Sequence, residues 1–384
     1  MKFVSWFLFS IVLIGCKTSV YNDDLSLMKQ PRNFDEIFDA FWYGMSSHYI
    51  YWDIDTTDWA MIYKKYKPLF QRLDVNNKND VSQSADYLRE ITRGLIDSHF
   101  QIVFEENMLA GAIIFPAADR KAKESEFRLP FDYSVLDEKY FDVGYLHSID
   151  EVTKYNKKSQ EVKLATIRGN IIYFHCNQFS LERSYYSKAE GNVKFVLDKL
   201  FDRIYQNHYK GLIIDLRNNS GGDLADLNFF LNHFAQSELT IGYSKYKRAT
   251  GMLDYSPWIK ATIPSTKGEK GNLIPIVILA DRFTVSTAEL IMMSLYLLPN
   301  VKIIGETSWG ATGPIGATNL FQAGTFRVPG YLTVYTSSAA FKYFDGRIYE
   351  GIGFPPDVLI PFNSKKIADG IDTQLEYAIS VLDK

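Results

Sequence analysis

The chain has 384 residues, of which 46% are hydrophobic and 15% aromatic, and its formal net charge at pH 7 is −3. This length and composition predict two or three folded domains with ample core, and they exclude an intrinsically disordered chain. The near-neutral charge gives no reason to expect a nucleic-acid partner, and the two cysteines, Cys16 and Cys176, are too few for a disulfide framework.

The first sixteen residues have the layout of a secretory signal. Lys2 precedes an apolar run, 3–14, that is too short to span a bilayer as a mature helix. Leu13-Ile14-Gly15-Cys16 resembles the bacterial lipobox, whose cysteine becomes the lipidated first residue after cleavage. The alternative is an ordinary signal peptide with an incidental cysteine. The lipobox predicts a bacterial lipoprotein anchored at Cys16 in the cell envelope, in the periplasm or at the outer membrane, with residues 17–32 as a tether.

Residues 33–99 are predicted to form an N-terminal helical domain. The first helix begins near Asn33, where apolar residues start to recur at helical spacing. A second helix is expected from about Asp58 to Tyr66, with Pro68 marking its end. A third helix is expected around Ser82 to Leu95, just before the end of the domain at His99. The next segment, residues 100–165, is expected to be a connecting β-rich segment without a clear succession of strands.

A buried strand runs into a glycine pair in residues 211–222, GLIIDLRNNSGG. The apolar residues predict a strand that is covered on both faces, as in α/β sheets. Gly221 and Gly222 can adopt positive φ and bring backbone N–H groups close to a ligand, which suits an anion or oxyanion site. A sharp strand-to-helix turn without a ligand would have the same sequence pattern.

A second strand and helix follow the same plan. Leu273 to Ala280 predicts a strand, and Thr287 to Leu298 predicts a helix that is apolar on most sides. Ser286 therefore lies at the start of the helix. Its hydroxyl could cap the helix, or it could act as a nucleophile, because the free N–H groups of a helix N-terminus stabilise an oxyanion.

Four motifs in order, and the last helix, resemble one family of enzymes. They are GLIIDLRNNSGG at 211–222, TVSTAE at 284–289, IIGETSWGATG at 303–313, YEGIGFPPDV at 349–358 and DGIDTQLEYAISVL at 369–382. They resemble the tail-specific or C-terminal-processing serine peptidases, family S41, and within it the branch of tricorn and the interphotoreceptor retinoid-binding protein.

The resemblance implies an α/β fold, α+β overall, with a crotonase/ClpP-like ββα core. This catalytic domain would occupy residues 166–384, behind the N-terminal helical domain. Many members carry a PDZ domain between the two, but residues 101–165 are short for that module and show no carboxylate-binding loop. A degenerate PDZ domain and a simple β-linker both stay open, so specificity for substrate tails is not carried over.

The resemblance also implies the two reacting residues. The nucleophile of the family falls on Ser286. Many members use a lysine as general base in a G-K-G stretch, where this chain has Gly310, Ala311 and Thr312. Alanine cannot take a proton, so a Ser–Lys dyad is excluded unless another lysine reaches the site. The tricorn-like branch uses a histidine, matched here by His99, and imidazole titrates near neutrality as a general base must.

Further site residues follow from the same resemblance. Ser98 and Glu350 would complete a tetrad that orients the histidine; the alternatives are a helix-end hydroxyl and an exposed turn carboxylate. Glu289 is a possible helper, or it only solvates the helix.

Backbone amides would complete the site by forming the oxyanion hole. The expected donors are the N–H groups of Gly221 or Gly222 and of Thr287.

The function implied by these residues is that of an exported serine endopeptidase, a hydrolase that cleaves a peptide or protein substrate through an acyl-enzyme on Ser286. No cofactor is expected, and the sequence holds no HExxH motif or cysteine cluster that would predict a metal site. One alternative is a catalytically inactive relative, a lipoprotein that binds peptides or ligands. Another is a crotonase-type acyl-transfer enzyme, although no thioester pocket is marked. The oligomeric state stays open.

Overall fold

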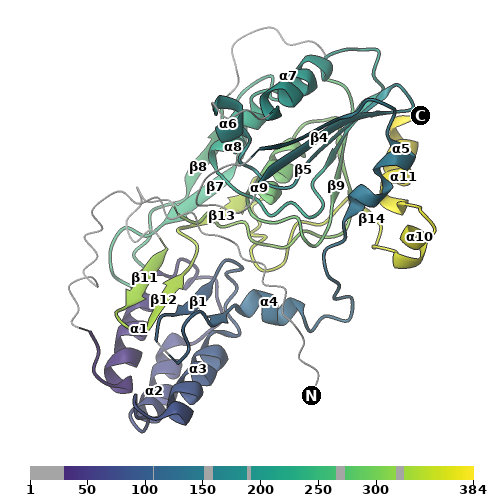
Figure 1. The fold of residues 1–384 in the computed structure, drawn as a ribbon. Coiled ribbons are helices and arrows are strands. Elements are labelled where there is room, and N and C mark those ends of the chain that lie inside the picture. Colours follow the sequence, from purple (N-terminus) through teal and green to yellow (C-terminus); the bar gives the residue numbers. More distant parts are fainter. Residues whose placement is uncertain (1–29, 107, 151–158, 188–191, 265–272, 317–323) are drawn as a thin grey trace.

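The computed structural model describes residues 30–384 except 107, 151–158, 188–191, 265–272 and 317–323. The expected signal at 1–16, with Cys16, and nearly all of the tether lie outside the described residues. Figure 1 shows a helical body with its own small sheet below, and a larger body built on a long twisted sheet above. The predicted α/β fold is confirmed.

The larger body is organised by a seven-stranded sheet in the order β14-β10-β9-β6-β5-β4-β3. The strands from β14 to β5 run parallel, and β4 and β3 are added antiparallel. In chain order the strands are β3 (Leu146–Asp150), β4 (Gln160–Ile167), β5 (Ile171–Cys176), β6 (Gly211–Asp215), β9 (Ile276–Ala280), β10 (Val301–Gly305) and β14 (Val358–Leu359).

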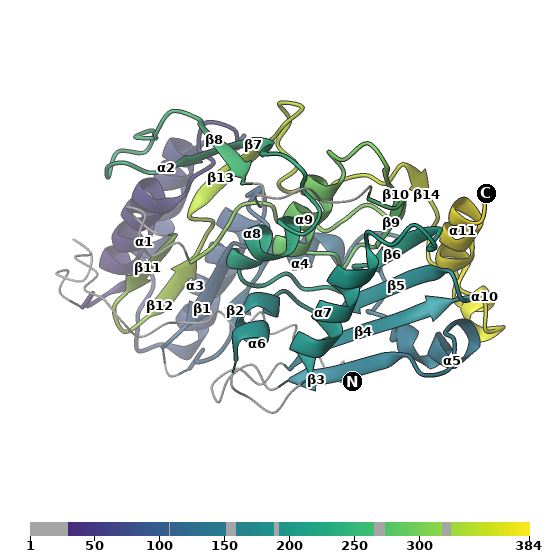
Figure 2. The same ribbon diagram turned by 90° about the horizontal axis from the view of Figure 1, so that it is seen from above.

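Helices cover both faces of this sheet, which explains the uninterrupted apolar strands. Leu212 and Ile214 of β6 pack into a core with α7, α8 and α9, whereas Ile213 packs on the opposite face against α11. Figure 2 shows the two helical layers on either side of the sheet. The helices are α5 (Asp137–Tyr140), α6 (Leu181–Tyr186), α7 (Val193–Arg203), α8 (Ala225–Leu231), α9 (Thr287–Leu295), α10 (Ser364–Ala368) and α11 (Thr373–Leu382).

The smaller body combines the predicted N-terminal helices with strands from distant parts of the chain. Strand β1 leaves the helical domain and pairs antiparallel with β12, more than 200 residues later. Aromatic side chains of the first two helices and Phe326 of β11 share its core. The elements are α1 (Phe34–His48), α2 (Trp59–Phe70), α3 (Lys78–Thr92), β1 (Gln101–Phe104), β2 (Ile113–Ile114), β11 (Thr325–Val328) and β12 (Leu332–Tyr335).

A third sheet of three strands, in the order β13-β7-β8, lies between the two bodies. Short helices lie along the connection from the smaller body to the main sheet. The elements are α4 (Pro116–Lys121), a 3₁₀ turn (Tyr133–Leu136), β7 (Leu239–Tyr246), β8 (Ile259–Ile263) and β13 (Ala339–Tyr343).

Two sequence expectations are refined by these elements. Helix α2 continues through Pro68 instead of ending before it. Proline in the last turn removes only one helical hydrogen bond, and Phe70 is fully buried with its ring stacked 4.7 Å from that of Phe38, so packing outweighs that loss. Residues 100–165 are divided between two sheets, because β1 and β2 join the smaller body while β3 and β4 join the main sheet.

No helix in the described part of the chain combines the length and the apolar character needed to cross a membrane.

Candidate active site

Ser286 lies in a strained turn between β9 and α9. Its φ of 60° and ψ of −123° make it one of three non-glycine residues with positive φ in the described ranges. Such a backbone conformation costs on the order of 1–3 kcal/mol and persists only where surrounding contacts impose it. A sharp strand-to-helix turn of this kind exposes the serine hydroxyl at the edge of a sheet. Ser286 is therefore presented as a nucleophile would be, and not as an ordinary extended N-cap.

The carboxylate of Glu289 imposes this turn. It is fully buried and accepts from the Ser286 N–H at 2.9 Å, the Gly310 N–H at 2.7 Å and the Ala311 N–H at 2.7 Å. The Ser308 hydroxyl donates to it at 2.6 Å. Burial raises the pKa of Glu289, and these hydrogen bonds oppose that shift. Glu289 thus positions the serine turn against the segment after β10.

His99 reaches the serine from the end of the helical domain. Its Nε2 lies 3.2 Å from Ser286 Oγ, within hydrogen-bond distance. Asp97 fixes the loop, because its carboxylate accepts from the His99 N–H at 2.9 Å and from the Ser337 N–H at 2.7 Å. Burial lowers the pKa of His99, and the charge of Asp97 partly opposes that shift. The imidazole is therefore neutral at pH 7, as a general base must be.

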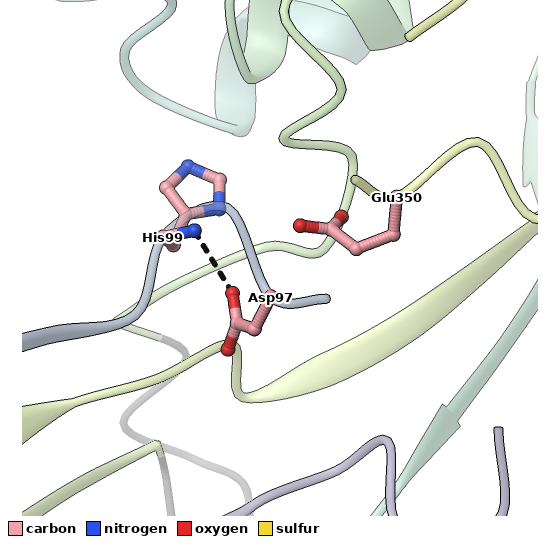
Figure 3. A group of neighbouring side chains, drawn as sticks. All are labelled: Asp97, His99 and Glu350. Atoms are coloured by element: carbon pink, nitrogen blue, oxygen red, sulfur yellow. Dashed lines mark hydrogen bonds between the residues drawn. The ribbon is translucent and has the colours of Figure 1, made fainter. Parts of the chain in front are cut away.

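The Glu350 carboxylate also lies close to the His99 imidazole. This carboxylate accepts from the backbone N–H groups of Ser98, Thr312 and Gly313, each at 2.7 Å, and from the Thr312 hydroxyl at 3.1 Å. Burial, followed by the charge of Asp97, raises the pKa of Glu350 to about 8. Figure 3 shows the carboxylate pointing toward the His99 ring.

The residues of the expected tetrad lie close together, but no continuous series of hydrogen bonds joins them. A nitrogen of His99 and carboxylate oxygens of Asp97 and Glu350 lie within 4.8 Å of one another. Neither His99 Nδ1 nor Ser98 Oγ makes a hydrogen bond of normal geometry to a described residue, although the Gly313 backbone carbonyl lies near the ring and favours its protonated form. Ser98 thus meets Glu350 through its backbone N–H, and its hydroxyl does not contact the histidine in this structure.

The glycine turn lies directly beside Ser286. A Cβ on Gly221, whose φ is +79°, would lie 2.7 Å from Ser286 Cβ, so only glycine fits there. The Gly221 N–H already donates to Asn219 Oδ1 at 2.9 Å and is buried. Gly222 is exposed, and no described residue accepts from its N–H or from that of Thr287. The Gly221 N–H is therefore taken, and among the expected donors the N–H groups of exposed Gly222 and of Thr287, a residue only 1% exposed, have no acceptor in the described ranges.

Asn219 is a residue whose role the sequence analysis missed. Besides accepting from Gly221, it donates through Nδ2 to the Cys176 carbonyl at 2.8 Å, and its own carbonyl accepts from the Val285 N–H at 3.0 Å. It joins the end of β5, the glycine turn and the residue before Ser286. The sequence offered two adjacent asparagines after a strand, but nothing to show which one points inward.

Ala311 occupies the position at which many relatives of the predicted family carry lysine. It is buried, and its N–H donates to Glu289. No lysine of the described ranges donates a hydrogen bond to Ser286. The acid–base partner that the structure offers is thus His99.

Asp97, His99 and Glu350 also form the one group of three potential metal ligands at close spacing in the described ranges. Each carboxylate already accepts four hydrogen bonds, those to Asp97 coming from His99, Thr336 and Ser337. A cation would have to displace these bonds, so the donor set does not fit a preformed metal centre.

The chain is similar in sequence to two curated proteins. The nisin-resistance protein of Lactococcus lactis subsp. lactis is 28% identical over 211 residues, and tricorn protease of Thermoplasma acidophilum is 27% identical over 179 residues. These alignments cover 54% and 47% of this chain. The chain spans 60% of the length of the first relative and 15% of the second.

Two solved structures share the fold. A crystal structure from Parabacteroides merdae ATCC 43184, assigned as a peptidase, superposes with a TM-score of 0.69 at 20% identity, covering 92% of this chain and 97% of that one. Mature CPAF superposes with a TM-score of 0.58 at 12% identity, covering 91% and 96%.

The family model of peptidase family S41 matches residues 170–360, which hold the glycine turn, Ser286 and Glu350. His99 lies outside the matched range and reaches the site from the helical domain. The family prediction made from the motifs is confirmed. The chain belongs to peptidase family S41.

Proposed function

We propose that the chain is an exported serine endopeptidase that hydrolyses peptide bonds through an acyl-enzyme on Ser286. The observation that carries this proposal is the 3.2 Å separation between His99 Nε2 and Ser286 Oγ, at a serine held in a strained turn beside two open amides. Nucleophile, base and oxyanion donors are the three parts that acyl transfer requires.

In the first half-reaction, Ser286 Oγ attacks the peptide carbonyl while its proton passes to His99 Nε2. The carbonyl oxygen becomes an oxyanion and accepts from the N–H groups of Gly222 and Thr287. The carbon–nitrogen bond then breaks, and the imidazolium gives its proton to the leaving amine. This leaves an acyl-enzyme on Ser286 and a neutral imidazole.

In the second half-reaction, a water molecule replaces the amine. His99 takes a proton from the water as it attacks the acyl carbon, and returns that proton to Ser286 Oγ as the product acid leaves. The protein ends in its starting protonation state.

Asp97 and Glu350 stabilise the imidazolium formed in these steps. Their carboxylates lie close to the ring, and a negative charge at such a distance favours the protonated form of histidine. With Nε2 accepting from Ser286, His99 must carry its remaining hydrogen on Nδ1. We propose that Glu350 moves onto Nδ1 when substrate binds, because catalytic hydrogen bonds are often loose without substrate.

A fluorophosphonate probe tests the nucleophile. We expect wild-type protein to be labelled, Ser286→Ala to be unlabelled, and His99→Ala to be labelled far more slowly. Labelling that persists in Ser286→Ala would refute the assignment. No labelling of any folded variant would favour the inactive peptide-binding relative, which also requires that the wild type hydrolyse no peptide.

Export and lipid attachment at Cys16 are a separate proposal, supported by the apolar run at 3–14 and the lipobox-like Leu13-Ile14-Gly15-Cys16. Incorporation of radiolabelled palmitate in a bacterial host should occur in the wild type and be lost in Cys16→Ala. Equal incorporation in both proteins would place the lipid on another residue. No incorporation in either would indicate an ordinary signal peptide.

A further inference from the structure

A groove opens at the residues that directly follow the exposed Gly222. One wall is the chain that follows Gly222, and the other is helix α6. The groove has a volume of about 560 Å³. Its lining residues are Glu182, Arg183, Tyr186, Asp223, Leu224 and Ala225.

The position of this groove ties it to the reaction. Asp223, the first wall residue, directly follows Gly222, whose N–H we assign to the oxyanion hole. An extended peptide advances about 3.3 Å per residue. A peptide whose scissile carbonyl rests on Gly222 therefore places a side chain near the bond at the mouth of the groove.

The described residues of the lining carry a net negative charge. Asp223 is paired with Arg183 at 2.8 Å, so these two charges offset each other. Glu182 has no cationic partner among the described residues and supplies the remaining charge. Buried Asp226 lies under this wall, where its carboxylate accepts from the backbone N–H groups of Leu181 and Glu182 at 2.7 Å each. These bonds fix the start of α6 and hold Glu182 at the groove.

The groove also offers apolar surface. Tyr186 is 70% exposed and Leu224 is 37% exposed, so both side chains can contact a group that enters the groove. An aromatic face attracts a cation, and apolar side chains pack along an alkyl stem. Lysine and arginine combine such a stem with a cationic end, whereas acidic side chains have a shorter stem and the opposite charge.

We propose that this groove is a substrate subsite for a basic side chain, lysine or arginine, with Glu182 as its charge partner and Tyr186 and Leu224 beside its stem. The proposal rests on the proposed peptidase function. It assigns a substrate class to the same site and a role to Glu182 in specificity.

Matched peptides test the subsite in the active enzyme. Quenched fluorescent peptides would be identical except for one lysine, glutamine or glutamate, moved across three positions on either side of the cleaved bond. At one position we expect kcat/KM for lysine to exceed that for glutamine by up to about fivefold, the upper end of what an exposed ion pair contributes, with glutamate the poorest. Equal values at every position would overturn the proposal.

Two variants should shift this preference in opposite directions. Glu182→Gln should bring kcat/KM for the lysine and glutamine peptides within about twofold of each other. Arg183→Gln should increase the preference, because it frees Asp223. Glu138→Gln, on α5 far from α6 (Figure 1), is the matched control and should change nothing. An unchanged preference in Glu182→Gln would overturn the proposal.

Binding to an inactive variant separates this proposal from the proposed function. Fluorescence anisotropy would compare labelled lysine and glutamine peptides on Ser286→Ala and on the double variant Ser286→Ala with Glu182→Gln. We expect tighter binding of the lysine peptide only when Glu182 is present. If that difference appears although the wild type cleaves no peptide, the peptidase function fails and the subsite stands. Equal or absent binding of both peptides overturns the subsite.

Discussion

The two halves of the candidate site are held in place by different means. The Ser286 half combines bonds between close neighbours in sequence with a few longer ones: Glu289 accepts from Ser286 three residues earlier, Asn219 accepts from Gly221 two residues later, and the Asn219 backbone carbonyl accepts from the Val285 N–H. The His99 half depends on contacts across the chain. Ser98 meets Glu350 over 252 residues, and Asp97 meets Ser337 over 240.

The two halves also differ in how many of their buried polar atoms are hydrogen-bonded. The Glu289 carboxylate accepts four hydrogen bonds, one of them from the Ser286 N–H, and these bonds hold the Ser286 turn in place. On the histidine side, His99 Nδ1 and Ser98 Oγ make no hydrogen bond of normal geometry to a described residue. The proposed nucleophile, Ser286, is therefore held in place by more hydrogen bonds of normal geometry than the ring of the proposed base, His99. Mutations on the two sides should differ accordingly in their effects on kcat and on pH dependence.

The largest effect is expected from removing the base. His99→Ala should lower kcat/KM for a cleavable peptide by about 10⁴-fold or more, because the serine then has no proton acceptor. His147→Ala, an exposed histidine paired with Glu161, is the control and should leave the rate unchanged. A loss below tenfold in His99→Ala would show that another group is the base.

The second largest effect concerns the open amide on the nucleophile side. Thr287→Pro removes the N–H at the first helical position, where proline is tolerated, and should lower kcat by about 10²- to 10³-fold. Thr287→Val keeps the N–H but loses the hydroxyl that donates to the Gly222 carbonyl at 2.8 Å, so it should cost much less. Equal losses in single-turnover measurements would assign the effect to the hydroxyl and not to the amide.

A smaller effect is expected where Asn219 positions the glycine turn. Asn219→Ala should lower kcat by about tenfold to a hundredfold with little change in KM, because a displaced oxyanion donor weakens transition-state binding only. Asn218→Gly, its neighbour at φ 59°, is the matched control. If the rate of Asn219→Ala falls only in proportion to the folded fraction measured by urea unfolding, Asn219 is purely structural.

The smallest effect is expected on the base side and depends on pH. Glu350 has a pKa raised to about 8 by burial, so its charge is gained as pH rises through 8. Because that charge stabilises the imidazolium, kcat/KM of the wild type should rise with an apparent pKa near 8. At lower pH, kcat/KM should fall a second time as His99 is protonated. This fall should occur below pH 6.5, because burial lowers the pKa of His99.

Glu350→Gln should abolish the step near pH 8, keep the His99 step, and lower the plateau by about tenfold. A pH profile with the step at 8 still present in Glu350→Gln would assign that step to another group. The glutamine variant keeps the size of the side chain, so unfolding midpoints at pH 6 should confirm that it remains folded.

Much of the nucleophile half could be predicted from the sequence. The strand ending in a glycine pair and the serine before an apolar helix lie where the pattern places them, as β6 and the start of α9. The sequence could not show which amide stays open, because Asn219 reaches Gly221 only through the exact path of the turn. The positive φ of Ser286 was equally hidden, since serine does not require it as glycine often does.

The histidine half could be predicted only by family resemblance. His99 follows a helix, and nothing in its local sequence distinguishes it from five other histidines. Glu350, whose carboxylate lies near its ring, and Ser337, which donates to Asp97, come from segments more than 200 residues away, so no local pattern links them to His99.

The sequence by itself determined the family and the α/β class and pointed to Ser286 as the proposed nucleophile, because these inferences rest on hydrophobic periodicity and on motifs within short windows. Tertiary structure alone decided which donors face the substrate, how Glu289 and Glu350 are buried, and that a groove opens beside Gly222. Burial, pKa and groove charge depend on which distant segments pack together, and that packing is a property of the whole fold.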